Sequence, residues 1–501
     1  MSSIGKKDIK RIAIANRGEV AVRIIRACED LGLETLLLHS EVDIGSRAYR
    51  LATKKICIGG APVSESYLNI QANIDGALAG GAHAIHPGFG FLSENADFAQ
   101  AVVKAGMVFI GPSAASIRLL GDKVSCKGLA RRASVPLVPG YEGEDQGIDR
   151  LIQEAKKIGF PVIAKAAAGG GGRGMKLLTG ELGARELLES AKRESLSAFG
   201  SDKVFLEKYL DHAKHIEFQI FADSTGRVIH LGDRECSVQR RHQKIIEEAN
   251  SVSLTEELRK KMGEDAVRLV QAGNYQGAGT VEFLLQDGEY YFLEVNTRLQ
   301  VEHPVTEEVM GIDLVKAQIL TAMGQFGFSS TQKYVAQGHS IECRIYAENP
   351  YMGGMPSTGK LGLVQFPEGP GRRFEYGFEE GDTITSFYDP MIAKVIVWDE
   401  TRGRCIQKMT EVLKRAIIFG VMTNIPYLIE ILNHPEFVDG TMTTRFIEKY
   451  FSQNFKEPVM GESEEELLKE LRVQVLGSRD FNLASQSSNM NSPWMQSWRN
   501  I

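Results

Sequence analysis

The most constraining feature of the sequence is a glycine-rich segment between two short apolar runs. Residues 165–176 read Lys-Ala-Ala-Ala-Gly-Gly-Gly-Gly-Arg-Gly-Met-Lys, with Pro161–Ala164 before them and Met175–Leu178 at their end. Glycines let backbone N–H groups approach anionic oxygens at dihedral angles that a Cβ would forbid, and the lysine at the strand end adds a positive charge. The segment predicts a strand–loop–strand unit that closes over phosphates, with ATP as the natural candidate.

A high glycine content is also typical of three other kinds of segment: a P-loop, a dinucleotide fingerprint and a flexible linker. A P-loop needs a Lys-Ser/Thr pair that opens a helix after the last glycine, but Gly174 is followed by Met175-Lys176-Leu177. A dinucleotide fingerprint needs a strand, the glycines and a helix in that order. A flexible linker is compatible with the glycine content alone, so only the remainder of the chain argues against it.

The length and charge of the chain bound the class of protein. The 501 residues are too many for one core and predict about two to four compact units. No apolar stretch is long enough to span a bilayer, and the N-terminus lacks the apolar segment of a secretory signal. A net charge of −6 argues against nucleic acid as the main partner. Six scattered cysteines without a Cys-x-x-Cys pair are expected to be reduced, mostly buried thiols in a cytoplasmic protein.

The order of the apolar runs predicts an α/β fold that opens with a parallel sheet. A helix is expected to follow the first strand and to stop at Gly32, which gives a strand–helix–strand unit. The turn Asn16–Glu19 holds a single glycine and is interpreted as the opening of that helix rather than as a nucleotide site. The strands expected in this region are Arg11–Ala15, Leu33–His39, Ala82–Ile85 and Met107–Ile110.

A second prominent feature is a β-hairpin predicted over Gly279–Arg298, with Asp287-Gly288 at its tip. Glu282 and Glu294 lie there among Val, Phe and Leu, and burying unpaired carboxylates is costly. A hard Mg²⁺ or Mn²⁺ ion held by carboxylate and amide oxygens offsets that cost and bridges nucleotide phosphates. Glu282, Glu294 and Asn296 are therefore candidate metal ligands.

The register of this hairpin decides whether the two glutamates share a face. A two-residue Asp-Gly loop would pair residue 282 with residue 293 and send Glu282 and Glu294 to opposite faces. A three-residue loop with Gly288 in the left-handed region would keep Glu282, Glu294, Asn296 and Arg298 on one face, and we predict that loop. Glutamates that point outward from a solvated strand are the alternative.

Two further runs carry clustered polar side chains. Gln239–Lys244 reads Gln-Arg-Arg-His-Gln-Lys and could bind small anions, although such a run alone is also typical of a solvated basic face. Leu299–Thr306 follows the hairpin and contains Glu302, a carboxylate that could act as a base toward an anion held nearby.

Taken together, these motifs resemble the biotin carboxylase component of biotin-dependent carboxylases, a member of the ATP-grasp superfamily, most like the acyl-CoA carboxylase α-subunit type. The resemblance covers about residues 8–452, about nine-tenths of the chain. The motifs that carry it, in family order, are Ile14–Glu19, His86–Asn95, Gly121–Lys123, the glycine-rich loop, Glu207–Leu210, Arg240–Lys244, Glu294–Arg298, Val301–Thr306 and Glu342–Ile345.

The resemblance implies an ATP-grasp fold in four parts. These are an N-terminal biotin carboxylase domain at 1–121, an ATP-grasp domain at 122–330 with a mobile lid at about 138–210, a C-terminal biotin carboxylase domain at 338–452, and a tail at 453–501. The tail is charged and then Ser/Asn-rich, and it carries Trp494 and Trp498 near its end. Exposed tryptophans make strong anchors in a partner's pocket, so the tail is expected to dock a carboxyltransferase or carrier subunit, with folding back onto its own domain as the alternative.

The resemblance also implies the roles of individual residues. Bicarbonate would be held by Lys244, Arg298 and the Val301 backbone, Glu302 would take its proton, and Arg344 would stabilise the biotin enolate. Mg²⁺ or Mn²⁺ would be held by Glu282, Glu294 and Asn296. The residues implied to bind ATP are Lys123, Lys165, Gly171, Gly172, the adenine hinge Glu207, Lys208, Tyr209 and Leu210, and His215, Gln239 and His242, with Glu282 and Glu294 reaching its phosphates through the metal.

Departures from the family pattern bear on biotin. Phe89 stands where many relatives have tyrosine, and Asn349–Met355 differs from the usual turn after Arg344, which puts the approach of biotin in doubt. The chain lacks the Ala-Met-Lys-Met signature of a biotinylated lysine, so biotin is expected on a separate carrier protein. A carboxyltransferase subunit would decide the final acceptor, and a homodimer is expected. A different ATP-grasp bicarbonate-using ligase and a catalytically dead nucleotide-binding scaffold are the alternatives.

Overall fold

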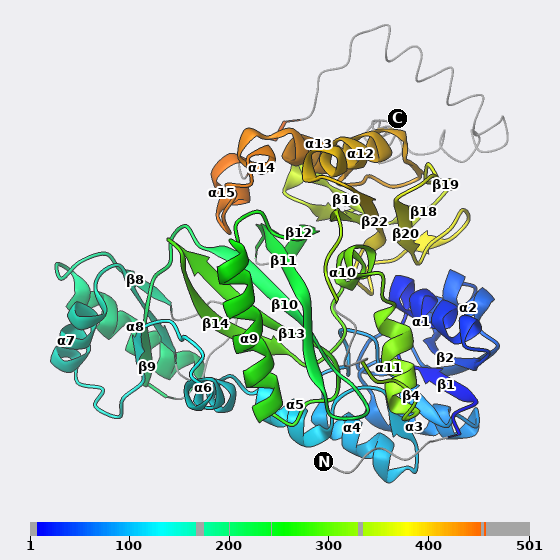
Figure 1. Ribbon diagram of the computed structural model, residues 1–501, viewed down its shortest axis with the longest axis horizontal. Coiled ribbons are helices and arrows are strands. Elements are labelled where there is room, and N and C mark those ends of the chain that lie inside the picture. The colour runs from blue at the N-terminus through cyan, green and yellow to red at the C-terminus, as the bar shows by residue number, and fades with distance from the viewer. Residues whose placement is uncertain are drawn as a thin grey trace, which may run out of the picture.

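The computed structural model describes residues 8–166, 175–199, 201–241, 243–328, 334–451 and 455–456. Within them, the chain forms a parallel sheet, a small antiparallel sheet and a large antiparallel sheet, each covered by helices (Figure 1). Gly171, Gly172, His242 and the expected docking tail, apart from Phe455 and Lys456, lie outside the described residues.

The N-terminal region is the expected parallel sheet, with strand order β3-β2-β1-β4-β5. Its first helix begins at Gly18, as predicted, and ends two residues before Gly32, which has a φ of +68° that favours glycine. Its strands are β1 Arg11–Ile14, β2 Glu34–Ser40, β3 Lys54–Gly59, β4 Ala84–His86 and β5 Val108–Phe109. Its helices are α1 Gly18–Asp30, η1 Glu41–Asp43, α2 Arg47–Leu51, α3 Ile70–Ala79, α4 Ala96–Lys104 and α5 Ala114–Gly121.

The strands that flank the glycine-rich segment pair with each other in a separate antiparallel sheet of order β6-β9-β7-β8, which Figure 1 shows at the left. This sheet and its two helices enclose a hydrophobic core of their own. The elements, reached through α6 Lys123–Arg132, are β6 Gly140–Tyr141, α7 Ile148–Ile158, β7 Val162–Ala166, β8 Lys176–Leu178, α8 Ala184–Phe199 and β9 Val204–Lys208. The predicted strand–loop–strand arrangement is confirmed for its two strands.

The large sheet has eight antiparallel strands in the order β14-β13-β10-β11-β12-β15-β22-β20. It is continuous across the pair β12–β15, so strands from before and after residue 330 form one surface. The strands are β10 Lys214–Ala222, β11 Val228–Arg240, β12 Gln243–Ala249, β13 Gly277–Gln286, β14 Glu289–Asn296, β15 His339–Tyr346, β20 Arg372–Tyr376 and β22 Met391–Asp399.

The two faces of this sheet differ in polarity because side chains alternate along each strand. One face is apolar and packs against α9 Glu256–Ala272, α12 Arg402–Arg415 and α13 Ile425–Asn433. The opposite face packs against α10 His303–Met310 and α11 Leu314–Ala322. The remaining elements are β16 Glu348–Asn349, η2 Pro350–Met352, β17 Met355–Pro356, β18 Gly359–Lys360, β19 Leu363–Gln365, β21 Thr383–Ile384, β23 Ile417–Phe419, α14 Pro435–Val438 and α15 Phe446–Phe451.

The loop of the β13–β14 hairpin is shorter than predicted. Asp287 and Gly288 alone form it, with φ values of +54° and +79°, and Gln286 pairs with Glu289. The predicted three-residue loop is therefore wrong. Glu282 still pairs with Glu294, because the register shifts by one residue at Leu293, and this β-bulge places the two glutamates on one face.

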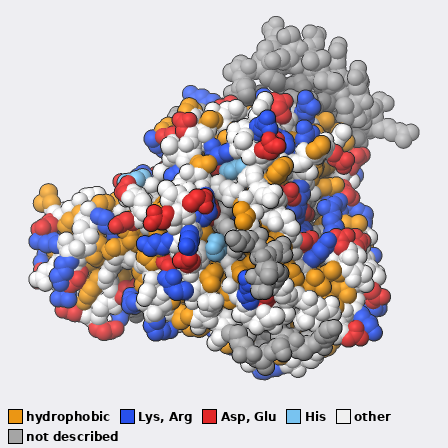
Figure 2. Space-filling model, viewed as in Figure 1, with side chains coloured by type: hydrophobic (Ala, Val, Ile, Leu, Met, Phe, Trp, Pro, Cys, Tyr) orange, Lys and Arg blue, Asp and Glu red, His pale blue; other side chains and the backbone are white. Residues whose placement is uncertain are grey.

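All six cysteines are free thiols, and five of them are buried, as expected for core residues. None of the helices in the described ranges is long and apolar enough to cross a membrane. Figure 2 shows basic and acidic side chains mixed over the face of the molecule that it draws.

Candidate active site

The α10 side of the large sheet carries a continuous band of charged side chains. The register places Glu217 opposite both Glu282 and Arg234, and the pairs Glu247–Glu342 and Arg344–Lys394 also face each other across strands. The residues of this charged face are Glu217, Arg234, Lys244, Glu247, Glu282, Glu302, Glu342, Arg344 and Lys394. All of them are at least intermediate in burial, and most are fully buried. Buried charges persist only when they are paired, so this face is a concentrated ionic site.

Lys244 lies at the centre of three carboxylates. Its Nζ donates to Glu217 Oε2 at 2.6 Å, Glu302 Oε1 at 2.7 Å and Glu282 Oε1 at 2.9 Å. Burial alone would lower the pKa of Lys244, but the acidic side chains around it raise that pKa well above its ordinary value. Lys244 is therefore a fixed positive charge.

Glu302 is held between two cations at the N-cap position of α10. Besides Lys244, Arg344 donates from Nη2 to Glu302 Oε2 at 3.0 Å, and the same guanidinium also pairs with Glu247. Burial would raise the pKa of Glu302, but Lys244, Arg344 and Arg234 hold it well below its usual range. Glu302 is therefore ionised and can accept a proton once an anion draws these cations away.

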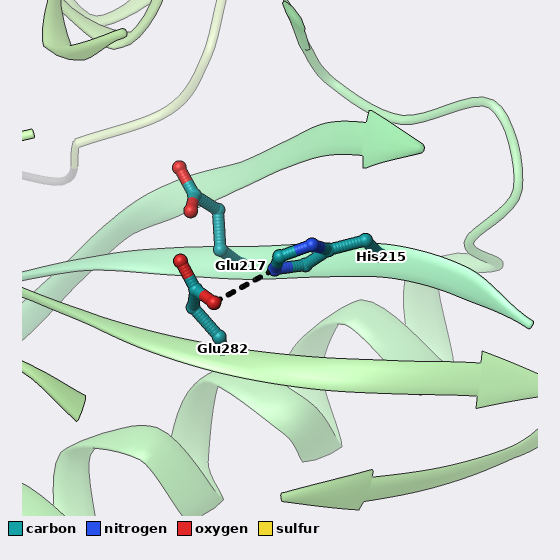
Figure 3. A group of neighbouring side chains, drawn as sticks. All are labelled: His215, Glu217 and Glu282. Atoms are coloured by element: carbon teal, nitrogen blue, oxygen red, sulfur yellow. Dashed lines mark ion pairs between the residues drawn. The ribbon is translucent and has the colours of Figure 1, made fainter. Parts of the chain in front are cut away.

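His215 lies beside Glu217 and Glu282 at one end of the charged face. Figure 3 shows the three side chains on the same side of β10 and β13, with His215 Nε2 3.0 Å from Glu282 Oε2. Their ligand atoms lie within 4.8 Å of one another. Gln239 contacts the other ring nitrogen of His215 at 2.6 Å, which fixes the orientation of the imidazole.

The hairpin residues predicted to bind metal come together on this face. Asn296 Nδ2 donates to Glu282 Oε1 at 2.9 Å, and Glu294, directly opposite Glu282, is ion-paired with the exposed Lys123 at 3.2 Å. Two carboxylates and an amide offer the oxygen ligands that Mg²⁺ and Mn²⁺ prefer. The pKa of Glu282 is well below its usual value, because the charges of Lys244 and His215 outweigh its burial, so it is available as a ligand.

Arg298 bridges the hairpin and the N-terminal region. Its Nε donates to Glu94 Oε2 at 2.9 Å, its Nη1 to Gln300 Oε1 at 2.7 Å and its Nη2 to Asn296 Oδ1 at 3.1 Å. Glu94 also accepts from the backbone N–H of Thr297 at 2.9 Å. The guanidinium is thus oriented beside the metal-ligand candidates by a residue from the loop before α4.

The predicted adenine hinge lies in the small sheet, apart from the charged face. Glu207 in β9 pairs with Lys165 in β7 and with Lys127 in α6, and these cations lower its pKa although burial opposes them. Lys208 donates to the carbonyls of Gly159 and Phe160, and Tyr209 donates from its backbone to Pro161. Leu210 is the second residue after the end of β9 and is half-buried. The structure therefore brings Lys165 together with the hinge residues and places Lys123 near Glu294.

The sequence interpretation missed five charged residues that shape the site. Glu94 orients Arg298, Arg234 pairs with Glu217, Glu247 shares Arg344 with Glu302, and Lys394 donates to the Val301 carbonyl at 2.6 Å. A signal for some of them existed, since Glu217 lies two residues after His215 on a strand and must share its face. Arg234 and Lys394 lie in strands that read as ordinary core, so only the three-dimensional pairing shows their role.

Known proteins are similar to most of the chain. Family models match at residues 8–117 (biotin carboxylase, N-terminal domain), 122–326 (carbamoyl-phosphate synthase L chain, ATP binding domain) and 342–449 (biotin carboxylase C-terminal domain). The biotin carboxylase of Haemophilus influenzae is 45% identical over 447 residues, which are 89% of this chain and 100% of that protein.

A longer relative and a solved structure extend the comparison. The methylcrotonoyl-CoA carboxylase subunit alpha of Dictyostelium discoideum is 44% identical over 490 residues, 97% of this chain and 70% of that protein. A biotin carboxylase structure from Campylobacter jejuni, in complex with a beta-gamma-ATP ligand, superposes with a TM-score of 0.82 at 42% identity and covers 88% of this chain and 99% of that one. The matched domains and the identity across whole relatives lead to one conclusion: the chain belongs to the biotin carboxylase family.

Proposed function

We propose that the protein uses ATP and bicarbonate to carboxylate biotin, through a carboxyphosphate intermediate. The observation that carries this proposal is the arrangement of Glu302 between Lys244 and Arg344, a carboxylate base with two fixed cations on a buried face. Bicarbonate is a small anion that must lose a proton before its oxygen attacks a phosphoryl group, and a base flanked by cations suits that task.

The first step is the binding and activation of bicarbonate. Its negative oxygens would accept from Lys244, Arg298 and the Val301 backbone N–H, and Glu302 would take its proton. The low pKa of Glu302 fits a resting state in which Lys244 and Arg344 both pair with its carboxylate. When Lys244 turns to the anion, Glu302 loses part of that stabilisation and becomes a stronger base.

The second step is transfer of the γ-phosphoryl group of ATP to bicarbonate. The charge on the phosphate oxygens would be met by Lys244, His215 and Arg298, with Lys123 at the rim. Glu282, Glu294 and Asn296 would hold a divalent cation, which would supply positive charge to offset the negative charge of the phosphate oxygens. The adenine ring would lie against Glu207, Lys208, Tyr209 and Leu210. Gly171, Gly172 and His242 are also proposed to bind the nucleotide, although they lie outside the described residues.

The third step releases CO₂ from carboxyphosphate to the ureido nitrogen of biotin. Arg344 would stabilise the negative charge that develops on the ureido oxygen, as a buried guanidinium can. In this step the nitrogen–carbon bond forms, the carbon–oxygen bond to phosphate breaks, and the phosphate takes the ureido proton. Phe89 contributes no hydroxyl here, and the 349–355 turn would border the approach of biotin.

The proposal also includes the partners, the oligomeric state and the domain limits of the chain. Biotin would arrive on a carrier protein, a carboxyltransferase subunit would use the carboxybiotin, and the chain would act as a homodimer. The divisions at 1–121, 122–330, 338–452 and 453–501 remain our proposal for its domains. The separate core of the small sheet supports a lid at about 138–210, which would close over ATP and keep water from carboxyphosphate.

The experiment is ATP cleavage by the purified chain, measured with and without bicarbonate and free biotin. Bicarbonate-dependent cleavage stimulated by biotin is the expected result. Stimulation by ammonia or by an aminoimidazole ribonucleotide would select another ATP-grasp ligase, and nucleotide binding without cleavage would select a scaffold. Glu302→Gln should abolish the biotin-stimulated rate, whereas the matched Glu308→Gln, on the same helix and half-buried beside Arg373, should retain it.

A further inference from the structure

Lys394 is a fully buried lysine that takes no part in the reaction steps above. It lies in β22 with no exposed side-chain surface, and its Nζ donates to the backbone carbonyl of Val301 at 2.6 Å. Its nearest charged partner is Glu19, in the first turn of α1, at 3.4 Å, and its ammonium lies 5.8 Å from the centre of the Phe89 ring. One side chain thus joins four segments that are remote in sequence.

The register of the sheet connects Lys394 with Arg344. These residues face each other across β15 and β22, so their side chains project side by side from the charged face. Arg344 binds the carboxylate of Glu302, and Lys394 binds the carbonyl of the preceding residue, Val301. Two neighbouring cations on the sheet therefore hold two consecutive residues of the loop that leads into α10.

We propose that Lys394 is a positioning residue for the bicarbonate site. Its hydrogen bond to the Val301 carbonyl holds the Val301–Glu302 backbone where the Glu302 carboxylate meets Arg344. This inference rests on the function proposed above. Fixing the Val301 carbonyl fixes the peptide plane that joins Val301 to Glu302, and hence where the Glu302 side chain starts. A shift of about 1 Å in a catalytic group is enough to lower a rate strongly.

The ionic surroundings show why a lysine is held at this position. Both carboxylate oxygens of Glu19 are buried without a hydrogen bond. Burial raises the pKa of Glu19 to about 7, while Lys394 lowers it and Glu375 raises it further. Glu19 therefore offers a weak counter-charge, and the short bond to the Val301 carbonyl is the stronger contact of the ammonium.

The test uses Lys394→Met together with Glu19→Gln, which removes the cation and the carboxylate that is ion-paired with it. The buried Glu342, which Lys394 also stabilises, stays in place. We expect the KM for bicarbonate to rise by about tenfold or more, because the Val301 backbone and Glu302 that would meet the anion are displaced, while the KM for ATP changes less than about twofold. Glu19→Gln alone keeps the Lys394–Val301 bond and should leave both constants near wild type.

A matched control is Arg402→Met. Arg402 also pairs with a buried carboxylate, Glu248, and donates to the carbonyls of Phe437 and Val438, but it lies on the opposite, apolar side of the sheet. Its loss should lower the thermal midpoint and leave the KM for bicarbonate unchanged. An equal rise of both KM values in the Lys394 variant, or a bicarbonate KM that rises as much in the Arg402 variant, would overturn the proposal.

A second readout does not depend on turnover. Amide hydrogen exchange of a peptide covering residues 299–306 should accelerate in the Lys394→Met, Glu19→Gln variant and not in Arg402→Met. Unchanged exchange there would overturn the anchoring role. If the wild-type chain showed no biotin-stimulated ATP cleavage, the proposed function would fall, and the exchange measurement would still decide whether Lys394 anchors Val301.

Discussion

Replacement of Lys244 by methionine would turn the most concentrated ionic cluster of the molecule into three buried carboxylates without their central cation. Removing one partner of a buried ion pair typically costs about 3–5 kcal/mol of folding free energy. In this cluster that cost should depend on pH. In the wild type the folded pKa values of Glu282 and Glu302 lie below their unfolded value of 4.5, so their stabilising contribution is complete above that pH and is lost on acidification.

Without Lys244, burial should push the pKa values of these carboxylates above the unfolded value. The folded variant would then hold protons that the unfolded chain releases, so its stability should fall as pH rises, by at most about 1.4 kcal/mol per pH unit for each such carboxylate and only until the pH passes the folded pKa of that carboxylate. Lys244 itself stays protonated throughout this window in the wild type. We expect the stability gap between wild type and variant to be about 1 kcal/mol near pH 5 and about 3–5 kcal/mol near pH 8.

Urea unfolding followed by circular dichroism at pH 5, 6.5 and 8 measures this gap. The matched control is Lys123→Met, which removes a lysine that is 78% exposed and pairs with the partly exposed Glu294, and it should cost little at any pH. A constant gap between wild type and Lys244→Met across the three pH values would refute the reasoning, because it would mean that the carboxylates do not take up protons when their cation is removed.

Three further predictions concern the reaction. Glu282→Gln with Glu294→Gln should raise the Mg²⁺ concentration needed for half-maximal ATP cleavage; an unaltered metal titration would show that the hairpin is not the metal site. Arg298→Ala should lower kcat far more than it raises the KM for ATP, since we propose that the guanidinium acts on the charged intermediates; parallel losses in steady-state kinetics would contradict that role. Gly171→Val should raise the KM for ATP while the circular dichroism spectrum stays unchanged, and an unchanged KM would remove the loop from the phosphate site.

The parts of the fold that the sequence could predict are those with local signals. Alternating apolar runs and a helix ending near Gly32 were enough to identify the parallel N-terminal sheet. The hairpin could be located from its Asp-Gly turn, but its register could not. The bulge at Leu293 carries no sequence signal, because leucine is also common in regular strands. Leu293 has no partner in the β13–β14 pairing, and this places Glu294 on the same face as Glu282.

The site residues divide in the same way, into those marked by a local sequence pattern and those whose partners are remote in the sequence. Glu302 and Lys244 stand in short polar runs that mark them as candidates. Lys394 is a single lysine in a strand that reads as ordinary core. Its burial follows from contacts with Glu19 and Val301, which are remote from it in the sequence. Ionic partners so remote in sequence are set by the packing of whole sheets, and no local pattern encodes them.

The continuity of the large sheet across β12 and β15 has a consequence for how the chain can be divided. A fragment that stopped before His339 would leave β12 paired with β11 only, so its backbone N–H and C=O groups on the β15 side would lose their partners next to the buried Glu247. Such an edge invites pairing between molecules, so the fragment should assemble rather than stay monomeric. We therefore expect the chain to tolerate a segment added after α15 far better than a division into two chains between β12 and β15.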